Sequence, residues 1–474
     1  GLVLAAEVRK HLGFGIIQSE GSITYTDIPD TFGKDTGSNG IRGHIFANGT
    51  FNHSENLRTQ VQFQLTSDDT YLKRYGFSRV DTLKSELLTE LFKGRSYYSL
   101  RALWFQGLRA EDVQGLTAFA LPLINLNLVS EPDRIGGVFN IQFNALALQR
   151  TDGMDSSRAT IRGSYVIPYT TRHGQILKLG VHFRGDVYNI SNSNRPDFNF
   201  FRGQDGSYSR FLPHLTASFE WPFVKTGKRT QQILTPIVTF VAAPTGGNPV
   251  GISNEDSRAF ELSDSNILSG NRMPGFDLWE SGSRFNFGFK WLIISKNFTI
   301  DTFFGESYRF AAKSTDPDDI RFAPGSGLST SLSDLVTRVD ITIKGKIRIS
   351  NRMRFDESSF KVRRNEIDAN IYIQNAMFGI GYYKLNRGLQ IQGLENREEI
   401  RIYGQYSFKT NWKVFGDITR NLTTTGATVF QGIGISYSDD CVELSVAWRK
   451  SFTTDREISP GTSILFRLRL KHLG

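Results

Sequence analysis

A two-residue alternation of apolar and polar side chains runs along almost the whole chain. In residues 57–66, leucine, threonine, valine and phenylalanine occupy the odd positions, while arginine, glutamine and threonine occupy the even ones. Such alternation predicts β-strands with one apolar and one polar face. Many of these segments hold ten or more residues; soluble strands are usually shorter, and a tilted strand that crosses a bilayer needs about 9–11. The chain is therefore expected to fold as a large antiparallel transmembrane β-barrel.

Composition limits how such a chain could reside in a membrane. Hydrophobic residues make up 39% of the chain and the mean hydropathy is −0.30, so no stretch approaches the roughly 18 apolar residues of a transmembrane helix. The 12% of aromatic residues and the 45 glycines suit interfacial girdles, turns and a curved sheet. Each aromatic residue on its own would also suit an ordinary strand.

The formal net charge is +9, and the basic residues are spread along the polar faces of the expected strands. Arg467, Arg469, Lys344, Lys346 and Arg348 have this placement. No nucleic-acid-binding motif accompanies them, so a nucleic-acid partner is not expected. In a barrel the polar face lines the lumen, where cations would favour an anionic cargo or an acidic partner surface. The other interpretation is a scatter of solvated charges balanced by nearby acids.

Alternation, length and turn residues together indicate about 23 strands in a single barrel domain over residues 1–474. The expected strands include 336–349, 351–363 and 366–375. Longer connections rich in Gly, Asp, Asn, Ser and Pro are the expected extracellular loops, at 28–40, 191–208, 243–280 and 311–335. Bacterial barrels normally have an even number of strands, so an odd count indicates either that the count is wrong or that strands are missing from this sequence.

Several short motifs occur in order along the chain. The first follows an expected strand and begins with Ser67, Asp68, Asp69, Thr70 and Tyr71. A Trp-Phe-Gln-Gly-Leu-Arg run follows at 104–109, and a later loop contains Asn271, Arg272, Pro274, Gly275 and Asp277. In this order the motifs make the chain similar to the LptD family, the outer-membrane lipopolysaccharide-assembly translocons of Gram-negative bacteria. The alphaproteobacterial branch fits best.

The first and the last of these motifs have a structural interpretation that we favour over direct binding of cargo. The Ser67, Asp68 and Asp69 side chains can hydrogen-bond to nearby backbone and form a tight turn. Pro274 and Gly275 signal a turn, which is expected to fold an outer loop inward over the lumen.

The resemblance implies a barrel of about 26 strands behind a periplasmic jelly roll, with lipopolysaccharide leaving sideways where the first and last strands meet. The chain is expected to lack the jelly roll and the first few strands of that barrel. Its last strand would supply one side of the lateral gate, through Ile464, Leu465, Phe466, Arg467, Leu468, Arg469 and Leu470. The implied partners are lipopolysaccharide, an LptE-like lipoprotein plug in the lumen, and an LptA-like periplasmic bridge that delivers cargo through the jelly roll. No cofactor is implied.

Cys441 is the single cysteine of the chain, so no internal disulfide can form. Family members commonly carry two adjacent cysteines near this place, disulfide-bonded to the N-terminal region. By that resemblance Cys441 would form one bridge to a cysteine upstream of Gly1, since the periplasm is oxidising. The alternative is a free thiol.

No enzyme signature is present: the chain contains no G-x-S-x-G, H-E-x-x-H or P-loop motif, and its seven histidines lack metal-ligand spacing. The chain is therefore expected not to be an enzyme, although catalytic groups assembled only in space would leave no such motif. A passive porin or a ligand-gated outer-membrane transporter is the rival function. The ligand-gated alternative predicts an N-terminal plug domain, and the LptD resemblance predicts a jelly roll there.

Overall fold

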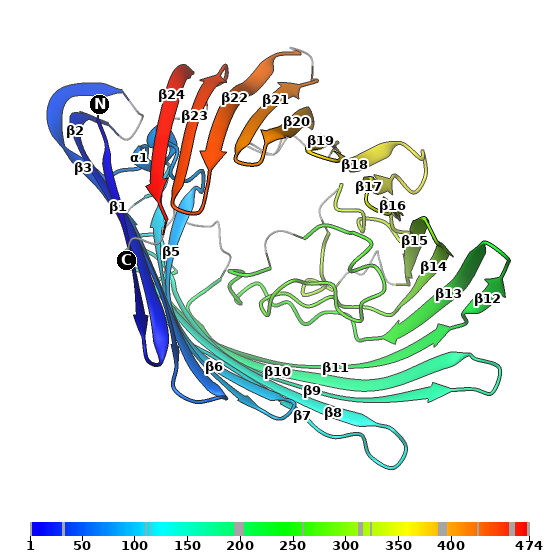
Figure 1. The fold of residues 1–474 in the computed structure, drawn as a ribbon. Helices are drawn as coiled ribbons and strands as arrows, with labels where there is room; N and C mark the ends of the chain where they lie inside the picture. The colour runs from blue at the N-terminus through cyan, green and yellow to red at the C-terminus, as the bar shows by residue number, and fades with distance from the viewer. Residues whose placement is uncertain are drawn as a thin grey trace.

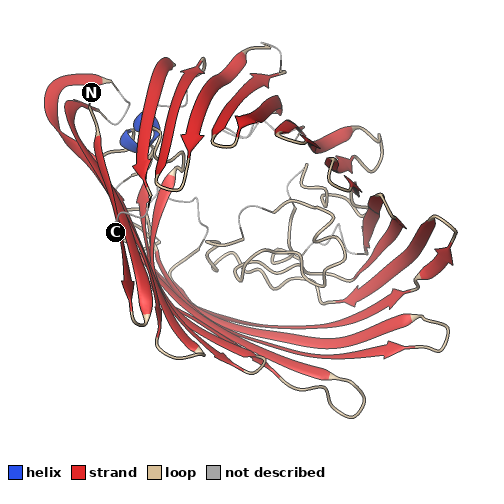
Figure 2. Cartoon of the chain, viewed as in Figure 1, coloured by secondary structure: helices blue, strands red, loops and turns tan. Residues whose placement is uncertain are grey.

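The computed structural model describes residues 2–30, 34–109, 111–113, 115–193, 203–257, 260–310, 316–322, 325–386, 396–423, 426–454 and 460–471. Strands dominate this structure, and one short helix lies among the described residues (Figure 2). The elements are β1 (Leu4–Leu12), β2 (Gly15–Pro29), β3 (Asp35–Asn52), β4 (Leu57–Thr66), α1 (Tyr71–Tyr75), β5 (Thr82–Lys93), β6 (Ser96–Gly107), β7 (Phe119–Val129), β8 (Val138–Gln149), β9 (Asp155–Thr170), β10 (Ile176–Ser191), β11 (Gly206–Glu220), β12 (Phe223–Thr226), β13 (Thr230–Ala242), β14 (Arg284–Ser295), β15 (Phe298–Arg309), β16 (Leu335–Ile343), β17 (Ile347–Phe355), β18 (Val362–Ile373), β19 (Ala376–Leu385), β20 (Arg397–Lys409), β21 (Trp412–Asn421), β22 (Thr428–Ser438), β23 (Val442–Ser451) and β24 (Gly461–Leu470).

All the strands belong to one 24-stranded antiparallel sheet. The sheet curves around a central lumen, and its two ends, β1 and β24, come near each other (Figure 1). This arrangement confirms the predicted all-β antiparallel fold. Among the described residues, no helix has both the length and the apolar character needed to cross a membrane.

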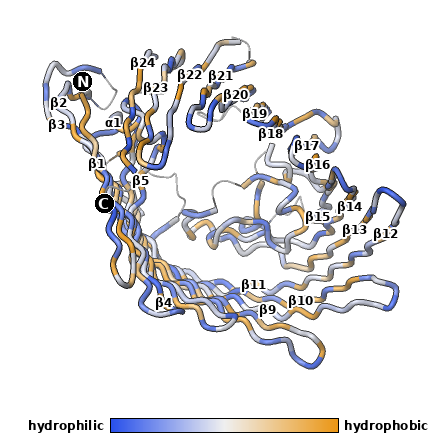
Figure 3. Tube along the Cα trace, in the orientation of Figure 1, coloured by the Kyte–Doolittle hydropathy of each residue, from blue (hydrophilic) through white to orange (hydrophobic). Residues whose placement is uncertain are grey.

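Hydropathy alternates along the strands (Figure 3), and the exposed fractions of the side chains show that the apolar face points outward. On β4, the odd-numbered Val61, Phe63 and Leu65 are 37%, 39% and 38% exposed. Many of the buried side chains are instead charged, including Arg42, Arg284 and Glu280. A protein in water would bury the first group and expose the second. The structure therefore suits a chain whose outer surface meets lipid.

The two ends of the sheet differ in their connections. Turns at one end are short, such as the two residues between β1 and β2 and the three residues 344–346 between β16 and β17. The longest connections all lie at the other end, at 67–81, 192–205, 243–283 and 310–334. Short periplasmic turns and long extracellular loops are typical of outer-membrane barrels.

Four predicted ranges, three strands and one loop, had wrong boundaries. The expected strand 336–349 is two strands, because Gly345, with φ +69, forms the turn between β16 and β17. Lys344 and Lys346 therefore lie in this turn, on either side of Gly345, and not on a strand face. The segments predicted at 351–363 and 366–375 become parts of β17 and β18. The expected loop 28–40 is mostly strand, since β2 and β3 stay paired up to the contact between Pro29 and Asp35.

The strand count differs from the expected one at a single place. β11 and β12 both pair with β13, at successive parts of its length, and are separated only by residues 221–222. They run in the same direction, whereas every other connection between consecutive strands reverses the chain. Consequently β1 and β24 point the same way (Figure 1).

Candidate functional site: the inner loop and the open edge of the sheet

The loop between β13 and β14, here called the inner loop, folds into the lumen (Figure 1). It consists of the described residues 243–257 and 260–283, and it contains the sequence motif that begins at Asn271. Its contacts with β9, β10 and β11 involve four arginines that face the lumen, here called the lumen arginines: Arg158, Arg162, Arg184 and Arg210.

The lumen arginines hold Phe276 and Asp277 from several sides. Arg158 forms an ion pair with Asp277, with Nη1 and Oδ1 2.5 Å apart. Arg210 donates a hydrogen bond of 2.7 Å to the backbone carbonyl of Phe276, and Arg184 donates to the same oxygen. The guanidinium of Arg162 lies 3.9 Å from the centre of the Phe276 ring, a cation–π contact. The motif is thus fastened to the barrel wall by charge-assisted contacts.

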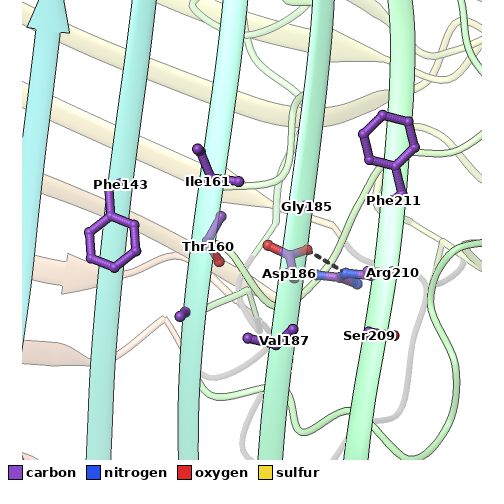
Figure 4. Close-up of a pocket in the computed structure, with 10 residues that line it drawn as sticks. Phe143, Thr160, Ile161, Gly185, Asp186, Val187, Ser209, Arg210 and Phe211 are labelled. Atoms are coloured by element: carbon purple, nitrogen blue, oxygen red, sulfur yellow. Dashed lines mark hydrogen bonds and ion pairs between the residues drawn. The ribbon is translucent and has the colours of Figure 1, made fainter.

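Asp186 lies between two of the lumen arginines and partly balances their charge. Its carboxylate is 2.8 Å from Arg184 and 2.6 Å from Arg210, and Figure 4 shows the second pair on neighbouring strands. A hollow along β8–β11 is lined by the exposed Ile161 and Phe211, which alternate with these inward-facing residues. It belongs to the lipid-facing wall.

A second ion cluster fastens the end of the inner loop to β14. Glu280 is fully buried and accepts hydrogen bonds from Arg272, whose Nε lies 2.9 Å from Oε2, while Arg284 approaches the same oxygen to 3.4 Å. Burial alone would raise the pKa of Glu280, but the guanidinium groups of Arg272 and Arg284 lower it to about 2. Glu280 therefore stays charged inside the protein.

The other residues of this motif have structural contacts. Asn271 accepts a 3.1 Å hydrogen bond from the backbone N–H of Glu280. At Gly275 a Cβ would lie 2.0 Å from a carboxylate oxygen of Asp256, so only glycine fits. Pro274 precedes it and Asp277 follows, which places all five predicted residues in one packed loop.

The first motif fastens the loop between β4 and β5 to the inner face of β2 and β3. Arg42 donates to Asp68 at 2.6 and 2.8 Å, and Asp68 accepts from the backbone N–H groups of Thr70 and Tyr71 at 3.2 and 3.0 Å. Burial opposes ionisation of Asp68, yet its hydrogen bonds and ion pair with Arg42 lower its pKa. The tight turn predicted from the sequence therefore also anchors the loop between β4 and β5 to the barrel wall.

Helix α1 continues this anchor. The Tyr71 hydroxyl lies 2.7 Å from the Ser22 hydroxyl, which is 2.6 Å from Nδ1 of His44. Tyr71 and Leu72 also pack in a buried apolar cluster with Phe46, Leu83 and Leu108. Ser67 accepts a 3.0 Å hydrogen bond from Gly43 N–H, and Asp69 lies in the same turn.

The edge of β24 is open in the described part of the chain. β24 pairs with β23 and β1 pairs with β2, and no backbone ladder joins β24 to β1. An ion pair of 3.3 Å between Glu7 and Arg469 links the two strands. The outward-facing residues of β24 are 52–73% exposed, namely Ile464, Phe466, Leu468 and Leu470. Leu465, Arg467 and Arg469 face inward.

Cys441 is exposed in the turn between β22 and β23, at the end of the sheet that carries the short turns. Its backbone N–H donates to Asp439 at 2.8 Å. This position gives a partner outside the sheet free access to the thiol.

Within the described ranges, one acidic group could hold a metal ion by spacing: Asp334, Asp356 and Glu357. Arg354 and Arg363 already form ion pairs with Asp334 and Asp356. Burial raises the pKa of Asp334 to about 7.

The lumen arginines and Arg42 were not predicted as site residues. The sequence signal for these arginines is their place in the two-residue alternation. Arg158 and Arg162 occupy even positions of β9, and Arg184 and Arg210 lie on the same face of the next two strands. This placement predicts a shared lumen face. It does not predict the loop residues that meet them.

Comparisons with known proteins identify the family. The family model for LptD, described as LPS transport system D, matches residues 40–412. No curated protein matches the chain significantly. Among solved structures, the siderophore receptor PirA from Acinetobacter baumannii is similar at a TM-score of 0.49 and 10% identity, covering 94% of this chain and 79% of that one. A Pseudomonas aeruginosa ferric enterobactin receptor (PfeA) mutant gives 0.47 and 9%, covering 98% and 80%. Neither score carries a functional argument.

Proposed function

This chain belongs to the LptD family of outer-membrane lipopolysaccharide transport proteins, and we propose that it inserts lipopolysaccharide into the outer leaflet. The polar head group would pass through the lumen, and the acyl chains would leave sideways at the edge of β24. The observation that carries this proposal is β24 itself, whose outward side chains are apolar and 52–73% exposed while Arg467 and Arg469 face the lumen.

Lipopolysaccharide is amphipathic, so its two parts need different surroundings. The lumen face offers charged and polar side chains, whereas the outward side chains of β24 are apolar and exposed. An ordinary strand pair would have to break a ladder of hydrogen bonds worth about 0.5–1.5 kcal/mol each to let acyl chains through. A seam held by few such bonds opens at lower cost.

The direction of the end strands bears on the rest of the barrel. Since β1 and β24 point the same way, an antiparallel closure needs an odd number of strands between them. We propose that the full-length protein supplies about three strands there, for a barrel of about 26, and a periplasmic jelly roll before them. The gate would then lie between β24 and the first of those strands.

We further propose the partners that the family resemblance implies. An LptE-like lipoprotein would stand in the part of the lumen that the inner loop leaves free, and an LptA-like bridge would deliver cargo through the jelly roll. Cys441, at the short-turn end, would form a disulfide with the N-terminal region. A photoreactive residue in place of Arg401, whose side chain is 57% exposed, should capture a smaller protein in cells.

The experiment that tests lateral release is a disulfide across the seam of the full-length protein. One cysteine replaces Leu468, and the other lies on the strand that faces β24. Oxidation should stop lipopolysaccharide from reaching the surface, and reductant should restore it. The matched control joins Val446→Cys and Phe466→Cys, which are already opposite each other in the β23–β24 ladder, and it should leave transport unchanged.

A passive porin or ligand-gated transporter would tolerate the same closure, because the lumen is unaltered. Normal surface lipopolysaccharide with the seam fully cross-linked would therefore rule out lateral release.

A further inference from the structure

Three arginines face the lumen beside the open edge of the sheet, and they are here called the seam arginines. Arg449 lies on β23 and Arg467 on β24, while Arg79 comes from the loop between α1 and β5. Arg79 and Arg449 lie beside the same ring: Arg79 is 4.9 Å from the centre of Phe430, and a Cβ on Gly432 would lie 3.4 Å from Phe430 and 3.5 Å from Arg449. Arg467 is on the same face of the neighbouring strand, with its backbone opposite Ser445. The loop brings α1 close to these strands, since a Cβ on Gly76 would lie 3.6 Å from Nη1 of Arg449 and 3.4 Å from Leu465.

The seam arginines carry excess positive charge. In the described part of the chain, none of the three forms an ion pair. Asp417 is the carboxylate that attracts Arg449, and it already forms a 2.9 Å ion pair with Arg401. Arg79 rests on the Phe430 ring, 4.9 Å from its centre, which leaves its charge unbalanced.

This arrangement contrasts with the lumen arginines, where Asp186, Asp256 and Asp277 compensate the charge. Guanidinium groups on one lumen face without a carboxylate partner favour an anion that can accept several hydrogen bonds, and phosphate is such an anion. The outer face of the same strand is apolar, with Ile464 and Phe466 73% and 67% exposed. One strand thus offers cations inside and an apolar surface outside, across a single sheet thickness.

We propose that the seam arginines bind the phosphate groups of the lipopolysaccharide head group while the acyl chains leave at the edge of β24. The site rests on the proposed function and adds to it the place where the head group is held. Binding there keeps the phosphates hydrated and paired inside the lumen while the tails reach lipid.

The test uses a photoreactive amino acid at Leu465, which lies among the seam arginines on the inner face of β24. In cells, the full-length protein should cross-link to lipopolysaccharide at this position. Replacing all three seam arginines with glutamine should lower that cross-link about tenfold or more, because each charge-assisted hydrogen bond is a strong one. The matched control is Arg348→Gln, another unpaired arginine of the polar face, on β17, and it should change nothing. Retained heat-modifiable migration of each variant shows that the barrel is folded.

A second measurement identifies the ligand group. The purified full-length protein, with its lumen partner, should bind bis-phosphorylated lipid A and lose that binding in the triple variant. Dephosphorylated lipid A should bind equally weakly to both proteins. Competition by inorganic phosphate at low millimolar concentration, with no preference for lipid A, would show a free-phosphate site and overturn the proposal.

Two outcomes separate this proposal from the transport function. An undiminished lipopolysaccharide cross-link in the triple variant, or a cross-link to an acidic protein in place of lipopolysaccharide, would overturn the phosphate site and leave lateral release standing. Absence of a lipopolysaccharide cross-link at Leu465 and at other lumen positions alike would contradict transport through this lumen.

Discussion

Replacing Glu280 with glutamine is expected to release the end of the inner loop from the barrel wall. The substitution keeps the size of the side chain and removes its charge. Arg272 and Arg284 would then remain buried without the carboxylate that now lies 2.9–3.4 Å from them. Loss of one partner from a buried ion pair typically costs about 3–5 kcal/mol.

The pKa of Glu280 gives a similar magnitude. It is lowered from 4.5 to about 2, and at about 1.36 kcal/mol per pKa unit this corresponds to about 3 kcal/mol in favour of the packed loop. Because the folded-state pKa is the lower one, the stabilisation is complete above the ordinary pKa of 4.5 and is lost as the pH falls towards 2. The loop should therefore detach in acid.

Hydrogen exchange in the full-length protein measures this release. The backbone amides around Arg272 and Glu280 should exchange faster in Glu280→Gln, and the part of their pH dependence between about 4.5 and 2 that Glu280 supplies should be lost. The control is Glu399→Gln, because Glu399 pairs with Arg397, whose side chain is 63% exposed, and exposed pairs contribute about 0–1 kcal/mol. Unchanged protection and an unchanged acid transition in Glu280→Gln would refute the reasoning.

Three further predictions follow from the fold. Arg42→Ala should lower the local stability of α1 by about 1–3 kcal/mol and speed its hydrogen exchange, because Asp68 loses its partner. Unchanged exchange in α1 would show that the turn holds the helix in place without Arg42. Gly345→Ala should destabilise the barrel by about 1–2 kcal/mol in urea unfolding, since Gly345 has a positive φ and no atom within 4 Å of a Cβ; no change would mean that the turn tolerates strain. A water-soluble maleimide should label Thr342→Cys and not Ile341→Cys, and the reverse pattern would exchange the two faces.

The sequence predicted the architecture well because alternation is a direct consequence of strand geometry. It failed at 336–349 for a physical reason. Ile343 and Ile347 pair across the turn and share the lipid face, and the three residues between them leave the two-residue period intact. Alternation therefore does not reveal a turn with an odd number of residues, and Gly345 was the local sign of this turn.

The contacts of the site were less predictable. Alternation can place Arg158 and Arg184 on the lumen face, but Arg158 and Asp277 are 119 residues apart in sequence. Nothing local to a loop specifies which strand it will meet. The motif residues, in contrast, were found by resemblance, and the structure places them in two anchored loops.

The positions of these anchors bear on where the sheet can part. The wall formed by β9–β11 and the start of β14 is fastened from inside by buried ion pairs, each of the kind whose disruption costs about 3–5 kcal/mol. β24 has no such brace among the described residues, since its Arg469 is 45% exposed where it pairs with Glu7. An exposed pair contributes about 0–1 kcal/mol. Because the inner loop braces the wall formed by these strands, a lateral opening at β24 leaves the braced wall and its lumen contacts undisturbed.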